Sequence, residues 1–275
     1  DPDHSCHRMA GDVIVSNGLA WSPDGRTMYH SDSRGAAIYR YDYDLATGAI
    51  GARELFVAMR PEWGRPDGGA VDAEGCYWGC GISAGRLNRF SPAGKLLLTL
   101  GRKGATGDNT SQDAFNGMAD VAVAKNGDVF IADGEGPNTR VVKFSKTGKF
   151  IKWWGGKGKD PGQFDVPHSI AIDGKGRVYV GDRSNNRIQI FDQSGKFLNQ
   201  WTNFGTPWGL FIKGDLIYVV DGTQNNCLFI ASTKDGKILE KIEGLSNPTA
   251  VAVDSKDAIY VGEVNGTNVK KFVKK

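Results

Sequence analysis

The sequence lacks any apolar run near the roughly 20 residues that a membrane-spanning helix needs. It also lacks a strong charge of one sign, because 34 Lys and Arg residues against 31 Asp and Glu residues leave a formal net charge of +3. This balance argues against a strongly basic nucleic-acid-binding protein. We therefore expect a soluble monomer with neither nucleic acid nor membrane as a partner. No basic segment followed by an apolar one opens the chain, so we expect no signal peptide, and the compartment stays open.

Cysteine is scarce, with 4 residues in the whole chain. Cys76 and Cys80 fall on one predicted strand, about 13 Å apart at 3.3 Å per residue, which is too far for a disulfide. Cys6 and Cys227 lie far apart along the chain, and the sequence alone does not say whether they pair. Because no C-x-x-C motif is present, we expect structural thiols and no redox centre.

Glycine, in contrast, is abundant, with 38 residues that recur at turn-like places between short β-rich segments. These segments share one template: an alternating strand, a polar turn, and a second β-branched or aromatic strand that in most cases ends in an acidic residue. The template fits residues 18–32, 68–78, 120–133, 169–182, 209–221 and 250–263. The third and fourth units continue clearly into a third and a fourth strand, so each unit is predicted to hold four short strands.

Six equivalent positions open the first strand of each unit: Asn17, Asp67, Ala119, His168, Trp208 and Thr249. Successive positions lie 40 to 52 residues apart, the period that a propeller blade requires. No stretch shows a 3.6-residue apolar period, so we expect few helices. The sequence therefore predicts an all-β protein, a six-bladed β-propeller of four-stranded blades that forms one domain over residues 1–275.

The sixth unit supplies only three strands before the chain ends, so its fourth strand must come from elsewhere. A propeller must protect the edges of its first and last blades. The N-terminal segment reads as a strand, and we predict that Ser5 to Met9 pairs beside Asn268 to Val273. The two ends of the chain would then close the ring by hydrogen bonds.

Residues that open the innermost strands of a propeller meet at one end of the central channel. Asn17, Asp67 and His168 are suitable metal ligands, and Trp208 and Thr249 can contact a substrate. Each has a structural alternative: His168 could bond a backbone carbonyl, and Asp67 or Asn17 could cap a turn. Because all three occupy the same repeat position, we predict a joint polar site in the channel.

Five acidic residues end the second strands of their units: Asp32, Asp133, Asp182, Asp221 and Glu263. A residue that recurs at a fixed blade position is expected to be structural, accepting hydrogen bonds from backbone or arginine groups at a turn. We assign these five no chemistry.

Two resemblances divide the chain. Residues 1 to about 100 resemble the gluconolactonase/regucalcin (SGL) family through the segments 16–25 (SNGLAWSPDG), 41–48 (YDYDLATG) and 65–75 (RPDGGAVDAEG). Residues from about 101 to 275 resemble NHL-repeat propellers related to the peptidyl-hydroxyglycine amidating lyase, through GQFDVPHS at 162–169 and DRSNNRI at 182–188. The two resemblances imply a hybrid, engineered or recombined. Gluconolactonase-like blades plus the closing strand would be joined to NHL-like blades.

The first resemblance implies a calcium-dependent lactone hydrolase whose metal is held by an Asn, an Asp and a Glu. Asn17 and Asp67 match two of these ligands, and His168 stands where counting around the ring places the Glu. The implied divalent-metal site is Asn17, Asp67 and His168, with calcium weakened and zinc competing better. Asp67 would help to deprotonate a water that attacks a small-molecule lactone. At most a reduced activity is expected, because the family's substrate-orienting Arg and Asn have no match.

The second resemblance implies little activity. The lyase family places three histidines around zinc, and only His168 has a counterpart in this chain, so lyase chemistry is not expected. A non-catalytic propeller scaffold, or an NHL-type module that binds a ligand or a protein, remains the alternative to a metal-dependent lactonase.

Overall fold

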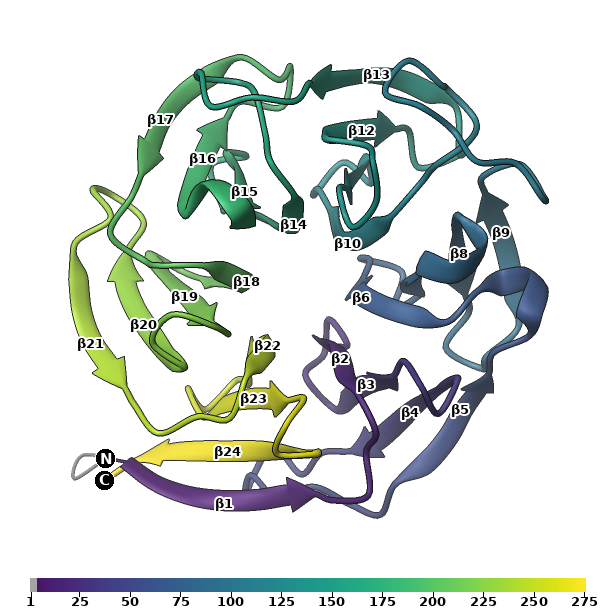
Figure 1. The fold of residues 1–275 in the computed structure, drawn as a ribbon. Helices are drawn as coiled ribbons and strands as arrows, with labels where there is room; N and C mark the ends of the chain where they lie inside the picture. The colour runs from purple at the N-terminus through teal and green to yellow at the C-terminus, as the bar shows by residue number, and fades with distance from the viewer. Residues whose placement is uncertain (1–3) are drawn as a thin grey trace.

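Six four-stranded antiparallel sheets form a ring around a central channel in the computed structural model, which describes residues 4–275 (Figure 1). The predicted six-bladed β-propeller is confirmed. Within the described residues the helices are three short 3-10 turns, η1 (Pro61–Trp63), η2 (Ile82–Ala84) and η3 (Arg183–Asn185). The expectation of few helices is therefore also confirmed, and in residues 4–275 none of these turns could cross a membrane.

In every blade the four strands follow one another from the channel outward. Blade 1 contains β2 (Ser16–Trp21), β3 (Thr27–Asp32), β4 (Ala37–Asp42) and β5 (Glu54–Ala58). Blade 2 contains β6 (Pro66–Val71), β7 (Tyr77–Gly81), β8 (Arg86–Phe90) and β9 (Leu96–Leu100). Blade 3 contains β10 (Met118–Val123), β11 (Val129–Asp133), β12 (Arg140–Phe144) and β13 (Phe150–Gly155). Blade 4 contains β14 (Pro167–Ile172), β15 (Val178–Asp182), β16 (Arg187–Phe191) and β17 (Phe197–Trp201). Blade 5 contains β18 (Pro207–Lys213), β19 (Leu216–Asp221), β20 (Cys227–Ser232) and β21 (Ile238–Ile242). Blade 6 contains β22 (Pro248–Val253), β23 (Ile259–Glu263), β24 (Asn268–Lys274) and, outermost, β1 (His4–Ala10).

The hydrophobic core lies between neighbouring blades. The second strands β11 and β15 are buried along their whole length, because a blade covers each of their faces. One cluster joins Phe130 and Val141 of blade 3 to Ile170 and Val178 of blade 4. The tight turn after β10 needs a residue with positive φ, which Gly127 supplies at φ 86°. β-branched and aromatic residues suit such doubly covered strands, so composition and packing agree.

The N-terminal strand closes the ring. β1 pairs antiparallel with β24, with Ser5 opposite Val273 and His7 opposite Lys271. In Figure 1 the two strands lie side by side, with both chain ends at the same edge. The predicted pairing of Ser5 to Met9 beside Asn268 to Val273 is confirmed. Without β1 the β24 edge would present unpaired N–H and C=O groups.

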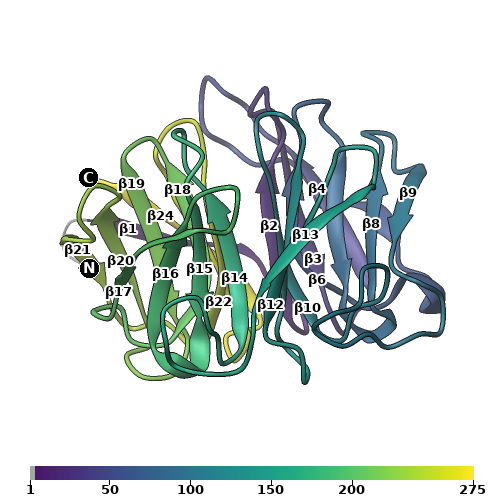
Figure 2. The ribbon, with the colours of Figure 1, turned by 90° about the horizontal axis from the view of Figure 1, so that it is seen from above.

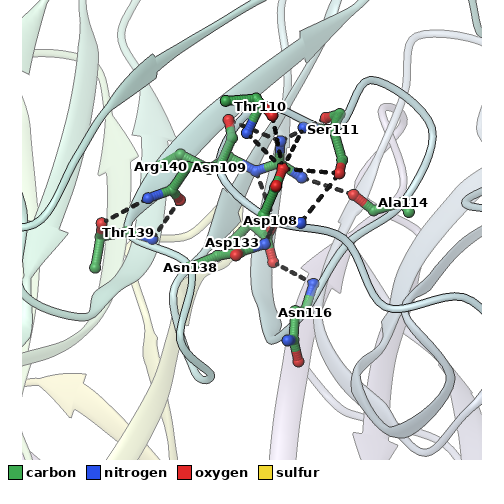
Figure 3. Close-up of polar contacts among 10 residues, drawn as sticks. All are labelled: Asp108, Asn109, Thr110, Ser111, Ala114, Asn116, Asp133, Asn138, Thr139 and Arg140. Atoms are coloured by element: carbon green, nitrogen blue, oxygen red, sulfur yellow. Dashed lines mark hydrogen bonds and ion pairs between the residues drawn. The ribbon is translucent and has the colours of Figure 1, made fainter.

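The acidic residues that end the second strands hold loops in place. The Nε of Arg140, which is fully buried, donates to Asp133 at 2.9 Å. The same guanidinium donates to the carbonyls of Asn109, Ser111 and Ala114, and so ties the preceding loop to blade 3 (Figure 3). This buried pair acts as a structural clamp, as the repeat position predicted.

The same position serves structure in other blades. Arg187 donates to Asp182 at 2.8 Å in blade 4, and Lys270 pairs with Glu263 at 2.8 Å in blade 6. Asp32 accepts hydrogen bonds from the backbone N–H groups of Ile14, Val15 and Gly35. The prediction of backbone and basic partners is confirmed at these positions.

The four cysteines are free in the described structure. Cys76, Cys80 and Cys227 are buried, and Cys6 is exposed on the closing strand. Burial raises the pKa of Cys227 to about 12, which keeps this thiol protonated and unreactive at neutral pH. These observations agree with structural thiols.

Candidate functional site

One cavity of about 360 Å³ occupies the central channel and is lined by the first strand of every blade. All six strand-opening positions line it: Asn17, Asp67, Ala119, His168, Trp208 and Thr249. The structure therefore brings the predicted site residues together around one space. Its volume falls in the range of small-molecule sites, roughly 300 to 1,000 Å³.

Asp67 is the most strongly perturbed of the predicted residues. Asp67 is 9% exposed, and burial raises the pKa of its carboxyl to about 7. The charge of His168 lowers this pKa, whereas the charges of Glu135 and Asp120 raise it further. A carboxyl with a pKa near 7 is ionised in part at neutral pH and can exchange a proton there.

Asp120 is a second carboxyl on the cavity wall, half-buried, and sequence reasoning missed it. Its two oxygens accept hydrogen bonds from the backbone N–H groups of Val121, at 2.8 Å, and Ile170, at 3.1 Å. Burial raises the pKa of Asp120 to about 7 against these hydrogen bonds. The register of β10 shifts between Met118 and Asp120, as it does near the start of the first strand in every blade. The repeat template singles out the preceding residue, Ala119.

His168 is hydrogen-bonded at both ring nitrogens. Nδ1 lies 2.6 Å from the backbone oxygen of Trp208, and Nε2 lies 3.0 Å from Oε1 of Glu135. Both partners are acceptors, an arrangement that a protonated imidazolium satisfies with its two N–H groups. The structural alternative predicted for His168, a hydrogen bond to a backbone carbonyl, is therefore present, with Trp208 as the partner.

Glu135 and Arg183 complete this network, and neither was predicted. Arg183 forms an ion pair with Glu135, and its guanidinium lies 4.2 Å from the centre of the Trp208 ring. Although burial raises the pKa of Glu135, its bonds and charge interactions with His168 and Arg183 lower it to about 2. The repeat template draws attention to strand-opening positions, whereas these two residues follow the ends of second strands.

The remaining polar residues are partly committed to neighbouring blades. Nδ2 of Asn17 donates to Oγ of Ser33 at 2.8 Å, which leaves its amide oxygen as an acceptor. Oγ1 of Thr249 donates to the backbone oxygen of Ser16 at 2.8 Å across the join between blades 6 and 1. Thr249 therefore helps to hold this join, and its predicted contact with a substrate would use the oxygen's acceptor capacity.

The predicted metal ligands do not fit a divalent ion in this arrangement. Asn17 and Asp67 keep oxygens that suit calcium, but both ring nitrogens of His168 already lie within hydrogen-bond distance of acceptors, Trp208 O and Glu135 Oε1. Among residues 4–275 there is no group of three or more His, Cys, Asp or Glu side chains placed to hold a metal. To bind a metal, His168 would have to give up its interaction with Glu135 or its hydrogen bond with the Trp208 carbonyl.

Family relationships divide along the chain. Residues 1–121 match the family model of the SMP-30/Gluconolactonase/LRE-like region. The first part of the chain is gluconolactonase-like. Residues 164–191 match the NHL repeat, so both predicted resemblances are confirmed. The first match ends inside β10, the opening strand of blade 3.

Curated relatives resemble the same N-terminal part. The 6-deoxy-6-sulfogluconolactonase of Pseudomonas putida is 48% identical over 98 residues, which cover 35% of this chain and 33% of that protein. Regucalcin of Danio rerio is 40% identical over 100 residues, which cover 36% of this chain and 34% of that protein. The chain thus spans about a third of the length of these relatives.

Structural similarity, in contrast, extends over the whole ring. A gluconolactonase from Xanthomonas campestris superposes with a TM-score of 0.75, covering 99% of this chain and 90% of that one. The two sequences are only 17% identical, so this likeness shows a shared fold.

Proposed function

We propose that the channel cavity binds a small-molecule lactone and hydrolyses it at a reduced rate. The observation that carries this proposal is Asp67, a buried carboxyl on the cavity wall whose pKa is raised to about 7. The lactonase name of the Pseudomonas putida relative and the gluconolactonase family model support it, because Asp67 lies within residues 1–121, which that model matches.

In the proposed reaction, ionised Asp67 takes a proton from a water molecule, and the water oxygen attacks the lactone carbonyl carbon. The ring C–O bond then breaks, and the leaving alkoxide takes up a proton, so that a hydroxy acid forms. The ring of His168 lies on the cavity wall, where the backbone oxygen of Trp208 and the carboxylate of Glu135 fix its orientation. Glu135 and Arg183 hold that ring in place and act as positioning residues.

The Asp67→Asn variant tests this proposal, because it removes the base and preserves the shape of the side chain. Wild-type kcat/KM should rise with pH through about 7, as Asp67 loses its proton. The variant should lose roughly 100-fold or more in rate and lose this pH dependence. A pH-stat assay with several lactones measures both effects. The exposed Asp44→Asn serves as the matched control, and full activity in Asp67→Asn would reject the proposal.

The divalent-metal site at Asn17, Asp67 and His168 remains a separate proposal, and the reaction above does not depend on it. Calorimetric titration of metal-stripped protein with calcium and with zinc tests it. Binding that His168→Ala abolishes would support the three-residue site. Binding that survives in His168→Ala but not in Asp67→Asn would instead assign the ion to oxygen ligands alone.

A non-catalytic ligand-binding or protein-binding propeller is the second candidate. The network that occupies both ring nitrogens of His168 favours it, because this arrangement leaves the inherited ligand position without a metal-binding atom. Ligand binding without turnover of any lactone would support this candidate.

We further propose that the chain combines blades of two families. Residues 1–100 plus the closing strand would be gluconolactonase-like, and residues 101–275 would be NHL-like. Separate matches to the two family models support this division. One natural gene that encodes all 275 residues would contradict it.

A further inference from the structure

The central cavity has two chemically different ends. Polar residues stand where the innermost strands begin, and apolar residues stand where several of them finish. The apolar residues that line the cavity at the second end are Trp21, Val71, Val123, Ile172 and Ile212, each half-buried. Because the six units repeat one template, their first strands run in the same direction. Figure 2 shows the ring from its edge, with strands running from one face to the other.

The charged groups are confined to the polar end. Among the described residues that line the cavity, the titratable side chains are Asp67, Asp120 and His168. All three fall in the opening half of their strands. Asn17 and Trp21, at the two ends of one strand, are separated by roughly 13 Å at 3.3 Å per residue. An acyl or alkyl chain of medium length spans this distance.

The apolar end also adjoins a second cavity. That cavity, of about 330 Å³, shares Val123 and Ile172 with the channel and continues between the turns that follow β10 and β14. The rest of its lining is mainly polar and includes Lys125, Asn126, Asp173 and Gln193. The apolar surface open to a chain is therefore that of the channel itself.

We infer that the substrate class is a lactone or ester that carries an apolar chain, and this inference rests on the proposed function. The carbonyl head would lie beside Asp67 and His168, and the chain would run along Val123, Ile172 and Ile212. A sugar lactone carries hydroxyl groups on most of its ring carbons, and these would lose hydrogen bonds against an apolar wall. An alkyl chain at the same place would instead transfer from water to an apolar surface, which favours binding.

The test is a series of γ-lactones with alkyl chains of increasing length, compared with gluconolactone. We expect kcat/KM to rise by up to about fourfold for each methylene group that becomes buried. Val123→Thr, which is nearly isosteric, should lower kcat/KM for the long-chain lactones more than for the short ones. The matched control is Val273→Thr on β24, the third strand of blade 6 and away from the channel, which should leave the series unchanged. A flat series, or a preference for gluconolactone, would overturn the inference while leaving the proposed function intact.

Calorimetric binding of γ-lactams with the same alkyl chains separates the two proposals, because the ring amide resists hydrolysis. Chain-dependent lactam binding that Val123→Thr weakens, without hydrolysis of any lactone, would reject the proposed function and support the amphiphilic site. Lactam affinity that does not change with chain length would overturn the inference.

Discussion

Blades 2 and 3 differ in how they fill the repeat position at the end of the second strand. In blade 3 the second strand ends at Asp133, which lies opposite Arg140 in the register and pairs with it. In blade 2 the corresponding residue is Gly81, which lies opposite Arg86. The two blades therefore share the arginine of the clamp but not its acidic partner.

The backbone explains this difference. A Cβ atom at Gly81 would lie 1.7 Å from the carbonyl oxygen of Trp63, so no side chain fits there. Arg86 instead donates to the carbonyl of Gly101 at 2.7 Å, and its Nε is buried with no hydrogen-bond partner among the described residues. In blade 2 the backbone of η1 thus fills the space beside Gly81. An equivalent repeat position can therefore be filled by an ion pair or by close backbone packing.

The sharpest way to break this comparison is Arg140→Met. Removal of the arginine leaves the fully buried Asp133 and three carbonyls without their donor, and should cost about 3–5 kcal/mol of unfolding free energy. Urea unfolding measures this cost. The matched Arg86→Met should cost less, about 1.5–3 kcal/mol, because it removes one hydrogen bond from a charged guanidinium to a backbone carbonyl and no ion pair. Equal costs would show that the acidic partner contributes nothing.

A second comparison sets Asp133, which forms an ion pair with Arg140, against Asp67, on which Arg183 acts only through its charge. Because burial raises the pKa of Asp67 to about 7, the native state keeps a proton that the unfolded chain releases near pH 4. The contribution of Asp67 to stability is therefore fully present below about pH 4 and is lost as the pH rises through about 7. The neutral Asp67→Asn side chain avoids this loss.

We expect Asp67→Asn to gain on the order of 2–4 kcal/mol relative to wild type between pH 4 and pH 8. Urea unfolding of both proteins across this range measures the difference, and the pH effects of other carboxyls cancel in the comparison. A constant difference would mean that Asp67 has an ordinary pKa in the folded protein.

The smallest expected effect comes from an attempt to build the missing clamp with Gly81→Asp. Pattern alone would predict a gain, because Arg86 lies opposite. The structure predicts a loss of about 1–3 kcal/mol, since the new side chain collides with the Trp63 carbonyl. Gly174→Ala is the control, because its Cβ would meet open space, and thermal unfolding should separate the two. A stabilised Gly81→Asp protein would contradict the packing argument.

Much of the fold and part of the site could be predicted from the repeat. Strand position sets where a residue sits in a propeller, so Asn17, Asp67 and His168 were placed at one end of the channel without any distance information. Asp120 escaped prediction because the repeat singles out the strand-opening position, which is Ala119 in blade 3, and Asp120 is the residue after it. The partners of His168 escaped because Glu135 comes from blade 3 and Trp208 from blade 5, and pairing across blades leaves no local pattern.

By itself the sequence determined the number of blades, the strand that closes the ring and the set of residues that face the channel. It did so because β periodicity and turn chemistry repeat at a regular interval along the chain. Only the tertiary structure decided the protonation of Asp67, the partners of His168 and the missing clamp in blade 2. These depend on desolvation and on contacts between segments distant in sequence, which exist only once the blades have packed together.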